Sequence, residues 1–286
     1  MDTIKLNENV SIPVLGLGIY TIKDKNICTE CIRTALDNGY RSIDTAAIYE
    51  NEHITGQAVK ESGIPREDII ITTKLWVQDE GYVKAKKAIE ASLGRLKTDY
   101  IDILMIHEPM GDIYGQWKAM EEAYDEGRIK ALGVSNMYAD RLVDFHIHAR
   151  IKPVINQIRT NPYFQHLNTA EWMKKYHVVH QAHSPFSQGN LGILEDPVLL
   201  EIARVHQKTT AQVILRWLYQ RGITSLTRST KPERIIQNAQ IFDFALADSE
   251  MAMIKTLDRP DGNSFDNRDP RAIEVINSWT YSYEGV

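Results

Sequence analysis

Four side chains of complementary chemistry follow one another along the first part of the chain: Asp44, Tyr49, Lys74 and His107. They are a carboxylate, a phenol, an amine and an imidazole, and each stands at or just beyond the end of a short apolar run. An unpaired charge buried at such a position is costly, so Asp44 needs a cationic partner. Lys74 is the obvious candidate, and we expect the two to pair.

A free tyrosine titrates near a pKa of about 10 and is a poor proton donor at neutral pH. We expect the ammonium of Lys74 to lower the pKa of Tyr49, with Asp44 supporting the ammonium. His107 would donate to a substrate oxygen and orient it. Such a group suits the reduction of a carbonyl, with hydride from a cofactor and a proton from Tyr49.

Each residue also has an ordinary interpretation when it is taken singly. Asp44 and Lys74 could be a structural ion pair, Tyr49 a loop aromatic, and His107 a hydrogen-bonded core histidine. The order of all four, together with the surrounding motif, favours the catalytic interpretation.

The segments that carry these residues read as buried strands. Residues 39–52, GYRSIDTAAIYENE, indicate a helix stop at Gly39, a strand over residues 40–45 and a loop with Tyr49. Residues 69–74 (IIITTK) and 101–107 (IDILMIH) indicate two further strands, which end on the lysine and the histidine.

Strand and helix patterns alternate along the rest of the chain. Helical patterns cover residues 25–38, 52–61, 82–97, 114–126 and 210–219, with Thr209 or Thr210 as N-cap of the last. Eight apolar strands separate the helices: GLGIY, YRSIDTA, DIIITTK, YIDILMIH, IKALGVS, PVINQIR, VVHQAHS and ITSLTRS. This alternation predicts a (β/α)8 TIM barrel of the α/β class, with a doubly wound open sheet as the alternative. In the barrel, polar residues at or near the strand ends would meet at one face: Asp44, Lys74, His107, Asn136, Gln157, Ser184 and Ser229.

Three segments lie outside this core pattern or interrupt it. Residues 4–13 predict an N-terminal β-hairpin that caps one end of the barrel, and residues 258–286 an irregular C-terminal tail packed over one end. Gly16-Leu17-Gly18 lacks the rest of a dinucleotide-binding glycine motif, so close backbone approach is favoured. Cys28 and Cys31 have a C-x-x-C spacing, but they fall inside a helical pattern, so ordinary helix residues are favoured over a redox or zinc site.

Length, charge and composition limit the number of domains and the kinds of partner that we expect. The chain has 286 residues and a formal net charge of -5, which suits one large domain over residues 1–286. Lys and Arg form no basic stripe, so no nucleic-acid partner is expected. The start, MDTIKLNENV, lacks a basic segment followed by an apolar run, so we expect no signal peptide, and no apolar run approaches the length of a membrane span. We expect a soluble cytoplasmic protein, a monomer or weak homo-oligomer, with no metal.

The residue pattern resembles the aldo-keto reductase signature, and the likeness covers almost the whole chain. It is similar to the bacterial NADPH-dependent diketogluconate and glyoxal reductases of that family. The resemblance implies that Asp44, Tyr49, Lys74 and His107 form the family's catalytic tetrad. It also implies NADPH-dependent reduction of aldehydes and ketones to alcohols, and the reverse reaction.

The resemblance further implies a cofactor site on the barrel rim. The nicotinamide carboxamide would be held by Ser135 and Asn136, in GVSN, and by Gln157, in NQIR. The nicotinamide-stacking and pyrophosphate segment would be His183, Ser184, Pro185 and Ser187. The adenosine 2′-phosphate and adenine would be bound by Arg228, Ser229, Thr230, Arg234, Gln237 and Asn238. The two arginines and the start of the helix after Pro232 favour NADPH over NADH.

Three positions depart from the family pattern. His183 replaces the usual stacking tyrosine, Arg228 a lysine, and Glu108 a pocket tryptophan. We expect Glu108 to make the pocket more negative, and so to favour hydroxylated or cationic carbonyl compounds. Tyr20 and Trp76 are the other expected pocket aromatics, with a surface role as the alternative for Trp76.

Two other functions stay open at this point. One is a nicotinamide-binding regulatory module with little turnover. The other is a lyase that uses Lys74 as a Schiff-base amine. The substrate, a small carbonyl or alcohol compound, is not specified by these residues.

Overall fold

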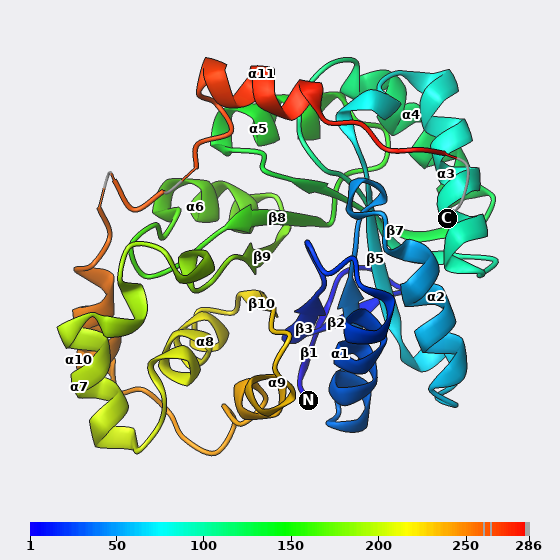
Figure 1. Cartoon of the computed structure of the whole chain (residues 1–286). Coiled ribbons are helices and arrows are strands. Elements are labelled where there is room, and N and C mark those ends of the chain that lie inside the picture. The colour runs from blue at the N-terminus through cyan, green and yellow to red at the C-terminus, as the bar shows by residue number, and fades with distance from the viewer. Residues whose placement is uncertain (260, 264, 284–286) are drawn as a thin grey trace.

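The computed structural model describes residues 1–259, 261–263 and 265–283. Eight parallel strands close into a barrel that helices surround (Figure 1). In chain order they are β3 (Leu15–Gly18), β4 (Ser42–Asp44), β5 (Ile70–Leu75), β6 (Ile101–Ile106), β7 (Ile129–Ser135), β8 (Ile155–Arg159), β9 (Val179–His183) and β10 (Thr224–Thr227). The ring closes because β10 pairs with β3 as well as with β9. The predicted (β/α)8 barrel is therefore confirmed, and the open sheet is excluded.

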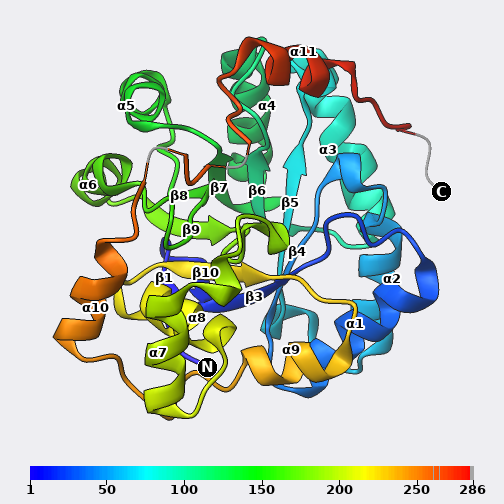
Figure 2. The same cartoon turned by 60° about the vertical axis from the view of Figure 1, so that its left-hand side comes forward.

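Helices cover the outside of the barrel, as Figure 2 shows from a second side. After β3 to β8 come, in turn, α1 (Lys25–Asp37), α2 (Glu52–Glu61), α3 (Tyr82–Leu96), α4 (Ile113–Asp125), α5 (Ala139–His148) and α6 (Leu167–Lys175). The later helices are α7 (Pro197–His206), α8 (Thr210–Gln220), α9 (Pro232–Asn238), α10 (Asp248–Lys255) and α11 (Pro270–Ser278). Short 3-10 turns are η1 (Ala47–Tyr49), η2 (Arg66–Asp68), η3 (Val77–Asp79), η4 (Ser187–Gly189) and η5 (Ile193–Glu195). The predicted N-cap of α8 is Thr209, whose hydroxyl accepts from the Gln212 amide.

The predicted N-terminal hairpin is confirmed: β1 (Thr3–Lys5) pairs antiparallel with β2 (Ser11–Pro13). Ile12 is fully buried and belongs to one apolar cluster with Ile103 and Ile155 of the barrel. Ile70 and Val179, the first residues of β5 and β9, pack against the same cluster. The hairpin therefore closes the amino-terminal end of the barrel and leaves the carboxyl end for the predicted site.

Cys28 and Cys31 lie on α1 as buried free thiols. Burial raises the pKa of Cys28 to about 12 and also raises that of Cys31, so neither is a reactive thiolate. They are ordinary helix residues. Within residues 1–259, 261–263 and 265–283, no group of three or more His, Cys, Asp or Glu is placed to hold a metal, and no helix could cross a membrane.

The prediction of an irregular tail is wrong over residues 270–278, which form α11. Asp269 caps this helix by accepting from the Arg271 amide, and Pro270 occupies its first position. Ala272 and Ile276 lie one turn apart and are both buried, which gives α11 its packed face. The tail lies next to α4 in both cartoons (Figures 1 and 2). Residues 260, 264 and 284–286 of the predicted tail lie outside the described residues.

The tail packs over the carboxyl side of the barrel, as predicted. Ile276 and Tyr281 form an apolar cluster with Trp76 and with Ala47 of η1. Asp79 of η3 accepts hydrogen bonds from the Tyr281 hydroxyl, the shorter of them at 2.8 Å. The tail is thereby fixed to the two turns that flank the predicted catalytic residues.

Candidate active site

Asp44 and Lys74 form a buried ion pair between adjacent strands. Lys74 Nζ lies 2.6 Å from Asp44 Oδ1 and also donates to the Thr45 carbonyl oxygen at 2.8 Å. The second carboxylate oxygen of Asp44 accepts from Gln157 Nε2 at 2.7 Å. β4 and β5 are neighbours in register, with Asp44 opposite Thr72, so the two strand ends bring these side chains together. The pair is held by hydrogen bonds on both partners.

Tyr49 and His107 stand next to this pair. The Tyr49 hydroxyl is 3.4 Å from His107 Nε2, and their rings meet at 77° with centroids 5.4 Å apart. Lys74 Nζ lies 5.2 Å from the centroid of the Tyr49 ring. Residues from η1 and from the ends of β4, β5 and β6 thus converge on one place, as the barrel prediction requires.

Burial dominates the electrostatics of this group. It raises the pKa of Asp44 and lowers that of Lys74, while their mutual attraction opposes both shifts. Burial also lowers the pKa of His107 well below its ordinary value, and the charge of Lys74 adds to that shift. His107 is therefore a neutral imidazole with a single N–H.

The expectation that Lys74 lowers the pKa of Tyr49 is wrong for the protein alone. Burial raises the pKa of Tyr49 well above its ordinary value, and Asp44, Tyr20 and Glu108 add to the rise. The reason is that Asp44 neutralises much of the ammonium charge of Lys74 at 2.6 Å, so the positive potential left at the phenol does not outweigh burial. Tyr49 is a protonated phenol at neutral pH.

Two aromatic side chains border these residues. The Trp76 ring meets the His107 ring at 76° with centroids 4.9 Å apart, and Trp76 Nε1 donates to the Trp279 carbonyl oxygen. Trp76 is only 3% exposed, so the alternative of a surface role is excluded. The Tyr20 ring lies 5.0 Å from the Tyr49 ring and is 40% exposed. Both rings therefore border the group formed by Tyr49 and His107.

The predicted carboxamide residues lie close to the four catalytic candidates. Ser135 ends β7 and is buried, and Asn136 follows it with a positive φ of 58°. Asn136 Nδ2 donates to the His107 carbonyl oxygen at 3.3 Å. Gln157 Nε2 donates to Gln181 Oε1 at 2.8 Å as well as to Asp44. Gln157 thus also supports Asp44, a role that its sequence position did not suggest.

His183 ends β9 beside this group. Its Nε2 donates to Asn136 Oδ1 at 3.1 Å, and its Nδ1 accepts from the Ser184 hydroxyl at 3.1 Å, because burial keeps the imidazole neutral. Pro185 follows, and then Ser187, whose buried hydroxyl has no hydrogen-bond partner among the described residues. Ser184 and Ser187 both have positive φ values, of 52° and 50°, in the turn after β9. The hydrogen-bonding capacity of this hydroxyl is therefore not met by the described residues.

The predicted phosphate and adenine residues gather after β10. Arg228, Thr230, Arg234 and Gln237 are exposed, whereas Asn238 is buried on α9. Ser229 Oγ accepts from the Lys231 amide at 3.0 Å. Arg228 donates to the Tyr20 carbonyl oxygen and to Thr21 Oγ1, both at 2.6 Å, so it also fastens the turn that carries Tyr20. This group follows β10, which pairs with β3 in the ring of strands.

The expectation that Glu108 makes the pocket negative is wrong at neutral pH. Burial raises the pKa of Glu108 to about 8, although hydrogen bonds from Asn267 and Asn136 oppose the rise. Both carboxyl oxygens accept, one from Asn136 Nδ2 at 2.9 Å and the other from Asn267 Nδ2 at 2.6 Å. The expected preference for cationic substrates depended on a free charge that Glu108 does not present.

Three supporting residues were missed by sequence reasoning. The carbonyl oxygen of Thr45 accepts from Lys74, and Gln181 accepts from Gln157. A polar residue within the apolar run VVHQAHS was a usable indication for Gln181. Asn267 is 159 positions from Glu108, and no local pattern could have joined them.

Comparison with known proteins gives consistent matches over most of the chain. The profile of the aldo/keto reductase family matches residues 14–259. Glyoxal reductase of Bacillus subtilis is 43% identical over 259 residues, which cover 90% of this chain and 93% of that protein. Morphine 6-dehydrogenase of Pseudomonas putida is 38% identical over 269 residues, with 89% and 90% covered.

Solved structures give the same result. The aldo-keto reductase MGS-M4 from a Medee basin deep-sea metagenome library superposes with a TM-score of 0.87 at 38% identity, covering 91% of this chain and 95% of that one. An aldo/keto reductase from Brucella melitensis superposes with a TM-score of 0.86 at 40% identity, covering 90% and 98%.

Proposed function

The chain belongs to the aldo/keto reductase family and is an oxidoreductase of carbonyl compounds, and from this premise we propose an NADPH-dependent reductase in which Tyr49 delivers the proton. The observation that carries the proposal is the 3.4 Å approach of the Tyr49 hydroxyl to His107 Nε2 beside the buried Lys74–Asp44 pair. We also propose that residues 1–286 form a single domain, which the closed ring of strands supports.

Tyr49 acts as the acid in this proposal. A phenol with a raised pKa stays fully protonated at neutral pH, and an alkoxide is a far stronger base than a phenolate. Proton transfer to the oxygen that gains charge during reduction therefore remains favourable. The neutral His107 donates its N–H to the same oxygen and holds it near the phenol. Lys74, 5.2 Å from the ring centroid, stabilises the phenolate left behind.

The residues of the rim fit a reduced nicotinamide dinucleotide, which supplies the hydride when bound. The orphaned Ser187 hydroxyl offers a buried polar group in the turn after β9. Ser135, Asn136 and Gln157 would hold the carboxamide, and His183 would lie against the ring. Ser184, Pro185 and Ser187 would follow the pyrophosphate.

The choice of NADPH depends on the cations after β10. Arg228 and Arg234 are exposed, and Ser229 and Thr230 add hydroxyls beside them. Arginines bind phosphate with paired N–H donors, and a 2′-hydroxyl offers them no charge. Gln237 and Asn238 of α9 would border the adenine.

Arg234 gives the cleaner test of cofactor choice, because Arg228 also holds the Tyr20 turn. We expect Arg234→Ala to raise the KM for NADPH about 10- to 100-fold, the worth of a charge-assisted hydrogen bond, and to leave the KM for NADH nearly unchanged. Steady-state kinetics with both cofactors measure this. Arg204→Ala, on α7 and paired with Glu201, is the control and should change neither value. Equal losses for both cofactors would contradict the phosphate assignment.

The raised pKa of Tyr49 predicts opposite pH profiles for the two directions. Reduction uses the protonated phenol, so its rate should stay flat from about pH 6 to 9. Oxidation of an alcohol needs the phenolate, whose fraction rises tenfold per pH unit below the pKa, so its rate should climb steadily over that range. Rates in both directions from one enzyme preparation check this. An oxidation rate that levels off near neutral pH would mean an ordinary or lowered pKa.

The substrates of this protein can be sought among the compound classes that the names of its relatives mention. We propose a screen of NADPH oxidation with glyoxal, simple aldehydes, sugars and polycyclic ketones. Turnover with any of them separates an enzyme from a regulatory nicotinamide-binding module. The complete burial of Lys74 between Asp44 and Thr45 disfavours the Schiff-base lyase, since the amine cannot reach a substrate. Borohydride trapping should accordingly give no lysine adduct.

A further inference from the structure

Glu108 and His183, two positions that depart from the family pattern, bind the same side chain. Asn136 Nδ2 donates to Glu108 Oε1 at 2.9 Å, and Asn136 Oδ1 accepts from His183 Nε2 at 3.1 Å. The remaining N–H of Asn136 is directed at the His107 carbonyl oxygen at 3.3 Å. Asn136 also has a positive φ of 58°, a conformation that costs free energy unless neighbours fix it. The two departures are therefore parts of one hydrogen-bonded unit.

The other oxygen of Glu108 reaches the C-terminal part of the chain. Glu108 Oε2 accepts from Asn267 Nδ2 at 2.6 Å. Asn267 belongs to the segment 265–271, which leads into α11. The guanidinium of Arg268 lies 4.0 Å from the Tyr138 ring centroid and gives this segment a second contact with the barrel.

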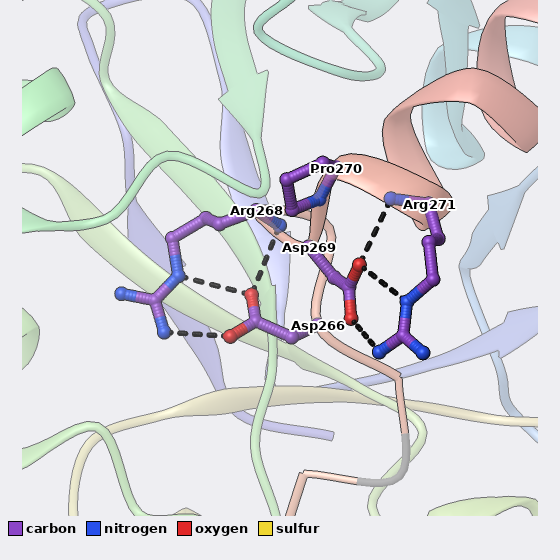
Figure 3. A pocket seen from close by; sticks show the side chains of 5 residues that line it. All are labelled: Asp266, Arg268, Asp269, Pro270 and Arg271. Atoms are coloured by element: carbon purple, nitrogen blue, oxygen red, sulfur yellow. Dashed lines mark hydrogen bonds and ion pairs between the residues drawn. The ribbon is translucent and has the colours of Figure 1, made fainter.

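The charges of this segment are paired within it. Figure 3 shows Arg268 turned onto Asp266 and Arg271 onto Asp269, with Pro270 between the two pairs. These residues line a hollow of about 620 Å³. Because Arg268 pairs with Asp266 and Arg271 with Asp269, neither arginine forms an ion pair with the barrel among the described residues. In the part of the chain that the structure describes, the Asn267 hydrogen bond to Glu108 and the Arg268 contact with Tyr138 join this segment to the barrel.

We propose that Glu108 is a positioning residue that fastens the cofactor-binding Asn136 to the C-terminal segment through Asn267, and so couples cofactor binding to closure of the segment 265–271. The cofactor half of this inference rests on the proposed function, whereas the attachment of the segment does not. Glu108 then contributes both to the orientation of Asn136 and to the position of the segment.

The two hydrogen bonds to Glu108 are strongest when its carboxyl is ionised. Two amide N–H donors face Glu108, and an ionised carboxylate accepts both, whereas a glutamine of the same shape offers one oxygen. The groups that act on Glu108 are Asn136, Asn267, the cation Arg159, and the phenols Tyr49 and Tyr138. With a pKa of about 8, the carboxyl accepts both bonds more fully as the pH rises through that value.

Hydrogen–deuterium exchange of residues 265–271 in the cofactor-free protein tests the attachment. At pH 9, where Glu108 is ionised, we expect Glu108→Gln and Asn267→Ala each to speed exchange there about tenfold. The double variant should exceed Glu108→Gln only slightly, because both remove the same bond. Arg271→Ala, which breaks only a pair within the segment, is the matched control and should leave the exchange unchanged. In wild type the exchange should slow between pH 7 and 9 relative to the intrinsic rate, and in Glu108→Gln it should not.

Cofactor affinity tests the coupling. Glu108→Gln should weaken NADPH binding about tenfold, measured by quenching of protein fluorescence, because Asn136 loses its support. NADPH should slow exchange of residues 265–271 in wild type and not in Glu108→Gln. Wild-type exchange in Glu108→Gln, or equal acceleration in Arg271→Ala, would overturn the inference. If wild type binds no NADPH, the proposed function fails, yet the exchange result in the cofactor-free protein still stands.

Discussion

Replacing Tyr49 with phenylalanine should lower kcat for carbonyl reduction by about 10²- to 10⁴-fold, the usual contribution of a positioned proton donor. The change removes one hydroxyl, which contacts His107 Nε2 at 3.4 Å, and leaves the ring in place against Tyr20 and His107. Since burial keeps this phenol protonated, it is the group with a proton to give at neutral pH. Single-turnover rates with saturating NADPH measure the loss directly.

Binding separates this loss from a general collapse of the site. The dissociation constant for NADPH should stay within about twofold of wild type, because the Tyr49 hydroxyl is assigned no cofactor contact. Tyr20→Phe is the matched control. It removes the hydroxyl of the neighbouring ring, whose centroid lies 5.0 Å from that of Tyr49, and the variant should keep most of the activity. If the Tyr49→Phe enzyme reduces aldehydes at the wild-type rate, the proposed role of Tyr49 as proton donor is wrong.

The strand ends explain why so much of this site was predictable from the sequence. Parallel strands in a barrel end on one face, so Asp44, Lys74 and His107 had to meet once each was placed at the end of an apolar run. The register then confirms it, with Asp44 opposite Thr72 and Lys74 opposite Met105 on adjacent strands. Order along the chain was enough to infer proximity in space.

The wrong predictions concern the protonation of Tyr49 and Glu108, which depends on what surrounds each side chain in the fold. The residue types allowed Lys74 to act on Tyr49, yet the distance from Lys74 to Asp44, 2.6 Å, shows which partner holds the ammonium. Glu108 was likewise predicted to carry a free charge, because no residue near it in the sequence indicated its hydrogen bond with the amide of Asn267. Burial and long-range partners are properties of the fold, and a local pattern does not contain them.

The tail shows a different kind of error. Residues 270–278 carry a helix start at Asp269-Pro270 and apolar residues one turn apart, so the pattern for α11 was present. The polar and aromatic character of the surrounding segment concealed it. The hydrogen bonds from Tyr281 and Tyr283 to Asp79 depend on pairs about 200 positions apart and could not be inferred.

Replacing Lys74 with methionine should lower the free energy of unfolding by roughly 3–5 kcal/mol, as expected when one partner of a buried ion pair is removed. Lys74 is fully buried, and its loss leaves Asp44 with the single bond from Gln157 Nε2. Reduction should fail as well, because the phenolate left on Tyr49 loses the nearby cation. Urea unfolding and steady-state kinetics measure the two losses.

The double variant Lys74→Met/Asp44→Leu separates the ion pair's contribution to stability from its contribution to catalysis. Removing both partners leaves no uncompensated charge, so stability should return to within about 1–2 kcal/mol of wild type, whereas activity should not return. The pH dependence of Lys74→Met gives an independent check. Without the lysine the folded-state pKa of Asp44 rises further above its unfolded value, so the folded state binds the extra proton and the deficit should shrink as the pH falls. A deficit that is the same at pH 5 and pH 8, or a double variant as unstable as the single one, would mean that lost packing rather than the stranded carboxylate causes the destabilisation.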